Sequence, residues 1–158
     1  MVKPTQLKVT VKNYLDGIDQ KKLLGTKCKK CGFIEVPAKS LCTKCLSDEI
    51  EIIEVKPEGK IAAFTCIGVG TTYFVEKGYS MKRPYCFAIV ELENGKMVSG
   101  QLIGGEISYK NDLPYINGTE IKVGLPVKGE FEEYKEEQKD RSGNKIEIPH
   151  CRLKFTPK

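Results

Sequence analysis

The chain has 158 residues, which is enough for one ordinary domain or for two very small ones. It is 40% hydrophobic and 30% charged, with a mean hydropathy of −0.33, a balance that indicates a soluble folded protein and excludes a disordered chain. No apolar run approaches the ~20 residues of a membrane-spanning helix, and the first residues lack the apolar segment of a signal peptide. We therefore expect a cytoplasmic protein that has no membrane partner.

The net charge of +5 is distributed unevenly along the chain. Residues 1–47 carry a net charge of +7, whereas residues 48–158 carry a net charge of −2. A nucleic-acid-binding domain concentrates positive charge on the surface that contacts phosphates. The acidic balance of the longer part therefore argues against nucleic acid as its partner, and a solvated lysine-rich face accounts for the N-terminal excess at least as well.

The first predicted element is a helix within residues 5–24. Gly17 and the β-branched run at 9–11 weaken this prediction. The apolar residues of this segment recur at close to helical spacing, and they are Leu7, Val11, Tyr14, Leu15 and Ile18.

The helix is followed by a cysteine-rich segment, residues 25–47, in a chain with seven cysteines. Two Cys-x-x-Cys pairs are separated by ten residues, and their members are Cys28, Cys31, Cys42 and Cys45. Four thiolates suit tetrahedral Zn²⁺ and leave no coordination position for water, so we predict a structural zinc ion rather than a catalytic one. Two alternatives remain, namely disulfides or unliganded thiols, and iron in a rubredoxin-like site with the same ligands.

From residue 49 onward the pattern predicts strands. The turn Asn94-Gly95 predicts a two-residue hairpin that pairs Glu93 with Lys96 and Leu92 with Met97. Five or six short strands with turn signals between them favour a small barrel over an open sheet. The candidate strands, of which five or six would form such a barrel, are residues 49–55, 60–69, 85–93, 96–103, 120–123, 127–134 and 151–155.

The other three cysteines, Cys66, Cys86 and Cys151, stand alone in apolar stretches, where cysteine is usually a small buried residue. A reactive thiol would need cationic neighbours and exposure. The single histidine, His150, precedes Cys151, but neighbouring residues of a strand face opposite sides, so we expect His150 at the barrel edge and not in a dyad. We therefore predict no catalytic residue.

A series of short motifs occurs in a fixed order along the chain. They are Tyr14-Leu15, residues 24–28, Cys31-Gly32, Val36-Pro37, residues 42–45, Gly59-Lys60-Ile61, Phe64-Thr65, Pro84-Tyr85, residues 87–92, residues 123–127 and residues 155–157. In this order of motifs the chain resembles the DUF35 family, in which a rubredoxin-like zinc ribbon precedes an OB-fold barrel. The family often has two prolines where this chain has Val36-Pro37, and residues 135–149 look like a lengthened hairpin outside the family pattern.

The resemblance implies a mainly β fold, with an N-terminal helix and zinc ribbon in residues 1–47 and an OB-fold barrel in residues 48–158. It also implies a non-catalytic, acyl-CoA-associated protein that binds or bridges thiolase-superfamily enzymes, such as acetoacetyl-CoA thiolase and HMG-CoA synthase, around a CoA site. The alternative is a nucleic-acid-binding protein whose aromatic residues stack on bases. Core packing is the competing interpretation of those residues, which are Phe64, Tyr73, Phe74, Tyr79, Tyr85 and Phe87.

Residues 68–84 form a connection longer than a hairpin needs, which makes it a candidate functional loop. If CoA is a ligand, Lys77, Lys82 and Arg83 could contact its phosphates, and the aromatic residues of the loop could meet adenine or a partner surface. Solvated cations are an equally good interpretation of these three residues.

Overall fold

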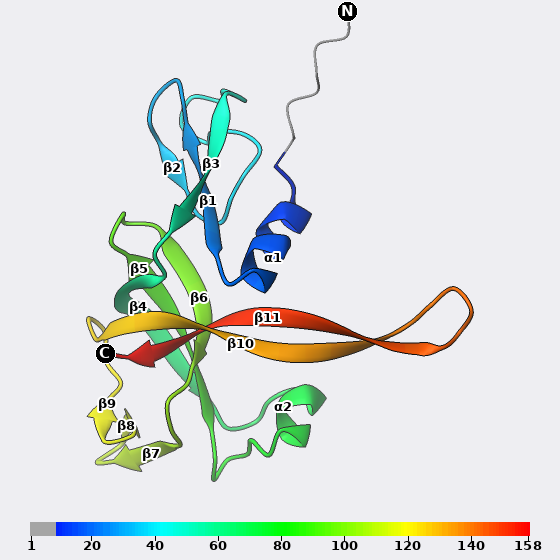
Figure 1. Ribbon diagram of the computed structural model, residues 1–158. Coiled ribbons are helices and arrows are strands. Elements are labelled where there is room, and N and C mark those ends of the chain that lie inside the picture. The colour runs from blue at the N-terminus through cyan, green and yellow to red at the C-terminus, as the bar shows by residue number, and fades with distance from the viewer. Residues whose placement is uncertain (1–8) are drawn as a thin grey trace, which may run out of the picture. The chain divides into compact units, whose positions relative to one another are not determined.

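The computed structural model describes residues 9–158 (Figure 1). The described chain is mainly β, as predicted, and none of its helices has the length and apolar character needed to cross a membrane. In chain order, its elements are α1 (Val11–Asp19), β1 (Leu23–Cys28), β2 (Ile34–Glu35), β3 (Ile50–Val55), β4 (Glu58–Ile67), α2 (Thr72–Glu76), β5 (Tyr85–Leu92), β6 (Met97–Leu102), β7 (Ile107–Lys110), β8 (Leu113–Ile116), β9 (Thr119–Glu120), β10 (Pro126–Lys139) and β11 (Lys145–Pro157).

Helix α1 begins with a capping box. The Thr10 hydroxyl accepts a hydrogen bond from the Asn13 N–H (3.4 Å), and the Asn13 side chain accepts one from the Thr10 N–H (2.8 Å). Two of the N–H groups that the first turn leaves without helical partners are thereby satisfied. The cap fixes the start of the helix at Val11, later than the spacing of the apolar residues suggests. Residues 5–8 of the predicted helix lie outside the described residues.

The ribbon sheet has the order β2-β1-β3 and is antiparallel throughout. Strand β2 pairs with two residues on one edge of β1. The backbone N–H and C=O groups on the other edge of β1 need hydrogen-bond partners of their own. Strand β3 supplies them in a register that runs from Leu23 opposite Val55 to Cys28 opposite Ile50. The sheet of the ribbon therefore extends past residue 47 into the segment expected to begin the barrel.

The barrel is closed in the order β10-β11-β6-β5-β4. Strand β11 pairs with β6 in parallel, with Phe155 opposite Leu102, whereas the β4–β5, β5–β6 and β4–β10 pairs are antiparallel. In barrel numbering the strands follow the cyclic order 1-2-3-5-4, which is the five-stranded Greek-key arrangement of an OB-fold. The predicted fold class is confirmed.

The barrel core follows the alternation of β5, in which Cys86, Ala88, Val90 and Leu92 are buried. Gly100 of β6 leaves room for the ring of the fully buried Phe155, because a Cβ atom at this position would lie 2.8 Å from that ring. Such close interdigitation is typical of protein interiors.

The predicted register of the β5–β6 hairpin is wrong by one residue. The structure pairs Glu91 with Met97, and Leu92 exchanges its backbone hydrogen bonds with Lys96 and Gly95. The connection thus has three residues, with Gly95 at φ +76° as the left-handed residue. A one-residue shift moves every side chain to the other face, and the observed register is the one that buries Val98 and Leu102.

A three-stranded sheet of β7, β8 and β9 follows β6 in the chain. Its hairpins turn at Asn111-Asp112 and at Asn117-Gly118, and all four residues have positive φ. These are the residues that two-residue hairpin turns favour, so the turn signals were present in the sequence. The strand predicted at residues 120–123 captures only the last residue of β9.

Contacts divide the chain into two compact units. One unit takes in the chain up to Lys56 together with Phe131–Arg152, and the other consists of Pro57–Glu130 and Leu153–Lys158. Strands β10 and β11 contribute residues to both units, and their outer parts form the lengthened hairpin that the sequence predicts (Figure 1).

Within the first unit, the end of α1 contacts the lengthened hairpin. The Asp19 carboxylate accepts a hydrogen bond from the Cys151 N–H (2.7 Å) and lies 2.9 Å from Nδ1 of His150. His150 lies on β11, one of the barrel strands, and a carboxylate distant in sequence holds its ring. Burial raises the pKa of the neighbouring Cys151 thiol, which disfavours the reactive thiolate.

We expect Asp19→Asn to destabilise the protein by about 1 kcal/mol at neutral pH, since a partly exposed charge-assisted hydrogen bond is lost. The Cys151 N–H and His150 lower the pKa of Asp19, so the stabilising charge is fully present above the unfolded pKa of ~3.9. This stabilisation is lost as the pH falls through the lower pKa that Asp19 has in the folded protein. Urea unfolding should show that the difference in unfolding free energy between wild type and Asp19→Asn is smaller at pH 3 than at pH 5. Asp16→Asn is the control. A difference independent of pH would contradict this assignment.

Candidate functional site

The four cysteines predicted as ligands come from two turns of the same shape in the ribbon. In the first turn the Gly32 N–H donates to the Cys28 carbonyl, and in the second the Leu46 N–H donates to the Cys42 carbonyl, both at 2.9 Å. Gly32 and Leu46 both have left-handed backbones, with φ of +73° and +58°. Leu46 thus occupies the position where such a turn favours glycine.

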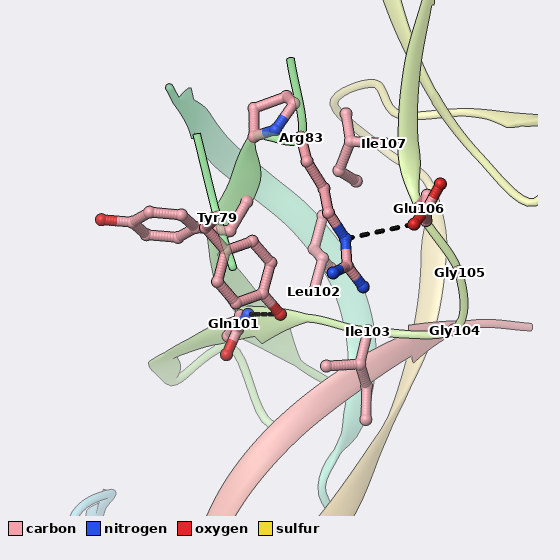
Figure 2. A pocket seen from close by; sticks show the side chains of 11 residues that line it. Tyr79, Arg83, Gln101, Leu102, Ile103, Gly104, Gly105, Glu106 and Ile107 are labelled. Atoms are coloured by element: carbon pink, nitrogen blue, oxygen red, sulfur yellow. Dashed lines mark hydrogen bonds and ion pairs between the residues drawn. The ribbon is translucent and has the colours of Figure 1, made fainter. Parts of the chain in front are cut away.

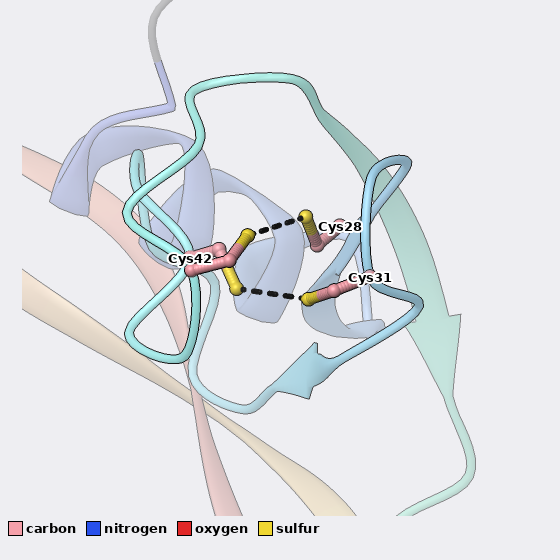
Figure 3. Close-up of side chains that lie close together, drawn as sticks. Cys28, Cys31 and Cys42 are labelled. Atoms are coloured by element: carbon pink, nitrogen blue, oxygen red, sulfur yellow. Dashed lines mark hydrogen bonds between the residues drawn. The ribbon is translucent and has the colours of Figure 1, made fainter.

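The four sulfurs converge on one point (Figure 3). All lie within 4.8 Å of one another, with 3.6 Å between Cys28 and Cys45 and 3.5 Å between Cys31 and Cys42. A tetrahedral site with Zn–S bonds of ~2.3 Å has sulfurs about 3.8 Å apart. The donor set and its spacing therefore fit a zinc ion, which would cross-link the two turns.

The electrostatics of the cluster favour a bound cation. Backbone N–H groups, first that of Cys31, lower the pKa of Cys28 to about 7 in opposition to burial. The Ser47 N–H likewise lowers the pKa of Cys45, but burial and the neighbouring sulfurs outweigh it and raise this pKa to about 12. Four thiolates cannot gather without a compensating charge, and binding of a divalent cation releases the remaining protons.

A carboxylate that could not be recognised from the sequence contacts the second turn. Glu35 is 7% exposed, and its side chain accepts a hydrogen bond from the hydroxyl of Thr43, which lies between Cys42 and Cys45. Lys39 provides the matching charge at 3.4 Å. A buried carboxylate needs such partners. The one available signal was an acidic residue inside the apolar run 33–37.

The aromatic residues of the loop between β4 and β5 pack on one another. Phe74, which belongs to α2, stacks on Tyr85 with ring centroids 4.0 Å apart, and Tyr79 and Phe87 contact this pair edge-on. Tyr73 is the most exposed member of the group at 40%. The packing interpretation therefore describes most of this group better than base stacking does.

The three cations proposed for CoA phosphates lie in different surroundings. Arg83 pairs with Glu106 (3.1 Å) and lines a cavity of about 310 Å³, whereas Lys77 lies 5.8 Å from the centre of the Tyr73 ring. Lys82 is exposed and, like Lys77, is not a lining residue of that cavity.

Cys66 and Cys86 lie directly opposite each other on β4 and β5 and are joined by a disulfide. The apolar stretches around these cysteines predict two separate core residues. This prediction is wrong in one respect, because the strand register makes the two cysteines neighbours. Disulfide-bonded sulfurs do not act as thiol nucleophiles.

Comparisons with known proteins agree with this architecture. Residues 15–51 match the family described as ChsH2, rubredoxin-like zinc ribbon domain. The chain is 28% identical over 119 residues to a DUF35 domain-containing scaffold protein of Methanocaldococcus jannaschii, covering 75% of this chain and 73% of that protein. It is 31% identical over 102 residues to benzoylsuccinyl-CoA thiolase subunit BbsA of Thauera aromatica, covering 65% of this chain and 63% of the subunit.

Among solved structures, the chain is similar to one described as the Ltp2-ChsH2(DUF35) aldolase. The TM-score is 0.63 at 18% identity, and the alignment covers 98% of each chain. At this identity the likeness shows the fold alone. The predicted resemblance to a zinc ribbon followed by an OB-fold is confirmed.

Proposed function

We propose, from the premise that this chain is a DUF35 protein, that it is a non-catalytic partner of thiolase-superfamily enzymes. Two kinds of relative support this function, one named a scaffold protein and the other a thiolase subunit. The partners would be enzymes of the acetoacetyl-CoA thiolase or HMG-CoA synthase type, which this chain would bind or bridge around a CoA site.

The observation that carries the proposal is the closed metal site. Four convergent sulfurs fill all positions of a tetrahedral ion, so the metal would organise the ribbon and bind no substrate. The other cysteines do not offer an activated thiol either, since Cys66 and Cys86 are disulfide-bonded and the pKa of Cys151 is raised.

The loop at residues 68–84 is the proposed contact for partner and CoA. Around its aromatic cluster it exposes the apolar side chains of Val69, Val75 and Met81, which are 78%, 57% and 74% exposed. Several large apolar side chains that are exposed in one loop favour a protein interface there. Lys77 and Lys82 stand in the same loop and would meet phosphates as point charges.

Purification of the tagged chain from its native cell tests the proposal, and we expect acyl-CoA-processing enzymes to co-elute. The Lys77→Ala, Lys82→Ala double variant should weaken CoA-dependent association about tenfold or more, because phosphate contacts to cations are lost. A variant with Lys12→Ala and Lys22→Ala, which removes two lysines of the first unit, is the matched control. Steep salt-dependent binding of single-stranded oligonucleotides with no co-eluting enzyme would support the nucleic-acid alternative instead.

A further inference from the structure

A cavity in the second unit combines a small volume with convergent hydrogen-bond donors (Figure 2). It lies between the end of the β4–β5 connection and the segment 101–107, and its volume of about 310 Å³ is at the lower end of the ~300–1000 Å³ typical of small-molecule sites. Much of its wall is apolar, from Leu102, Ile103 and Ile107. This size suits a small molecule rather than the whole of CoA.

The guanidinium group of Arg83 is only partly engaged. Its Nε donates to Glu106 at 3.1 Å, and Figure 2 shows the two terminal nitrogens directed away from Glu106, toward the space beside Ile103. The Arg83–Glu106 pair is well exposed, with side-chain exposures of 51% and 74%, so it holds the arginine weakly. One edge of the guanidinium fork is thus available to a second anion.

The hydroxyl of Tyr79 adds a third donor. It accepts a hydrogen bond of 3.0 Å from Nε2 of Gln101, which is 7% exposed, and this contact leaves the hydroxyl proton for another acceptor. The centre of the guanidinium lies 5.7 Å from the centre of the Tyr79 ring, so the two donor groups share one side of the cavity.

We propose that this cavity binds a small oxyanion that carries an apolar body, with Arg83 and Tyr79 as its donors. A planar carboxylate matches the free edge of the guanidinium, and the apolar wall accommodates the rest of the molecule. The nearby Glu106 neutralises part of the arginine charge and therefore opposes the ligand. This site stands independently of the proposed partner enzymes, because every group that forms it belongs to this chain.

The test uses the isolated full chain titrated with benzoate, hexanoate and inorganic phosphate to about 10 mM, which detects dissociation constants of about 1 mM. The two carboxylates should bind at the cavity, and changes in the NMR chemical shifts of Tyr79 and Gly104 would report this binding. Inorganic phosphate should bind more weakly because it makes no apolar contact, and tighter binding of phosphate would overturn the assignment to a carboxylate.

Three variants make the proposal falsifiable. Arg83→Gln should weaken carboxylate binding at least tenfold, Tyr79→Phe should weaken it several-fold, and Glu106→Gln should strengthen it several-fold. Lys110→Gln is the matched control, since it removes one positive charge from an exposed residue of the same unit without altering the cavity wall. Should Arg83→Gln fail to fold, Glu106→Gln still decides the matter.

Equal losses in Arg83→Gln and Lys110→Gln, weaker binding in Glu106→Gln, or no binding by wild type would each overturn the proposal. None of these results bears on co-elution with enzymes, so failure here is distinguishable from failure of the proposed function.

Discussion

Cys31→Ser should remove the metal and unfold the zinc ribbon while most of the barrel persists. In small zinc-binding peptides the metal contributes about 10–16 kcal/mol, which is comparable with the whole stability of a domain. The two short turns that carry the ligands bury few apolar side chains, since Cys28 and Cys42 are their buried residues. The barrel has its own core around Phe155 and Val127, so its NMR signals should remain dispersed.

Elemental analysis of the wild type should find one zinc ion per chain. If the site is instead of the rubredoxin type, the analysis would find one iron ion per chain. Cys151→Ser is the matched control, because Cys151 is a free cysteine outside the cluster, and it should leave the metal content unchanged. Wild-type protein without metal and with four freely titratable ribbon thiols would refute the prediction.

Gly59→Ala should destabilise the barrel by about 3 kcal/mol or more, which is at the upper end for an overpacked site. A Cβ atom at Gly59 would overlap the backbone carbonyl of Glu91 on β5, the strand with which β4 pairs. Because the obstacle is backbone and not the end of a flexible side chain, relief requires the strands to separate. This contact explains why the segment 59–61 begins with glycine.

Urea unfolding measures the difference, and Gly143→Ala provides the comparison. Gly143 has a positive φ of +84° but no atom within 4 Å of its would-be Cβ, so its replacement costs only the backbone strain of ~1–2 kcal/mol. Equal losses in the two variants would show that overlap with β5 is not the cause.

Several features were determined by the sequence itself because they depend on residues close together in the chain. Each Cys-x-x-Cys pair lies in a turn that is closed by a local backbone hydrogen bond, and each turn directs its two sulfurs to one side. The four residues are Cys28, Cys31, Cys42 and Cys45. The alternation along β5 likewise sorts its side chains between core and surface. Period and spacing are local properties, so the mainly β class and the cluster of four cysteines could be predicted.

Only the tertiary structure decided which distant residues meet. The strand register makes Cys66 and Cys86 neighbours and shifts the β5–β6 hairpin by one residue, because burial of Val98 and Leu102 outweighs the local preference of Asn94-Gly95. The pairing of Asp19 with His150 joins residues 131 positions apart.

The same holds for the proposed ligand cavity. Arg83 and Glu106 look like ordinary surface charges in the sequence, and Gln101 looks like an ordinary strand residue. Pairing of β6 with β5 places β6 beside the end of the β4–β5 loop, where Tyr79 contacts Gln101 and Arg83 contacts Glu106. Such contacts depend on how strands pair across the whole domain, and no pattern within either segment encodes them.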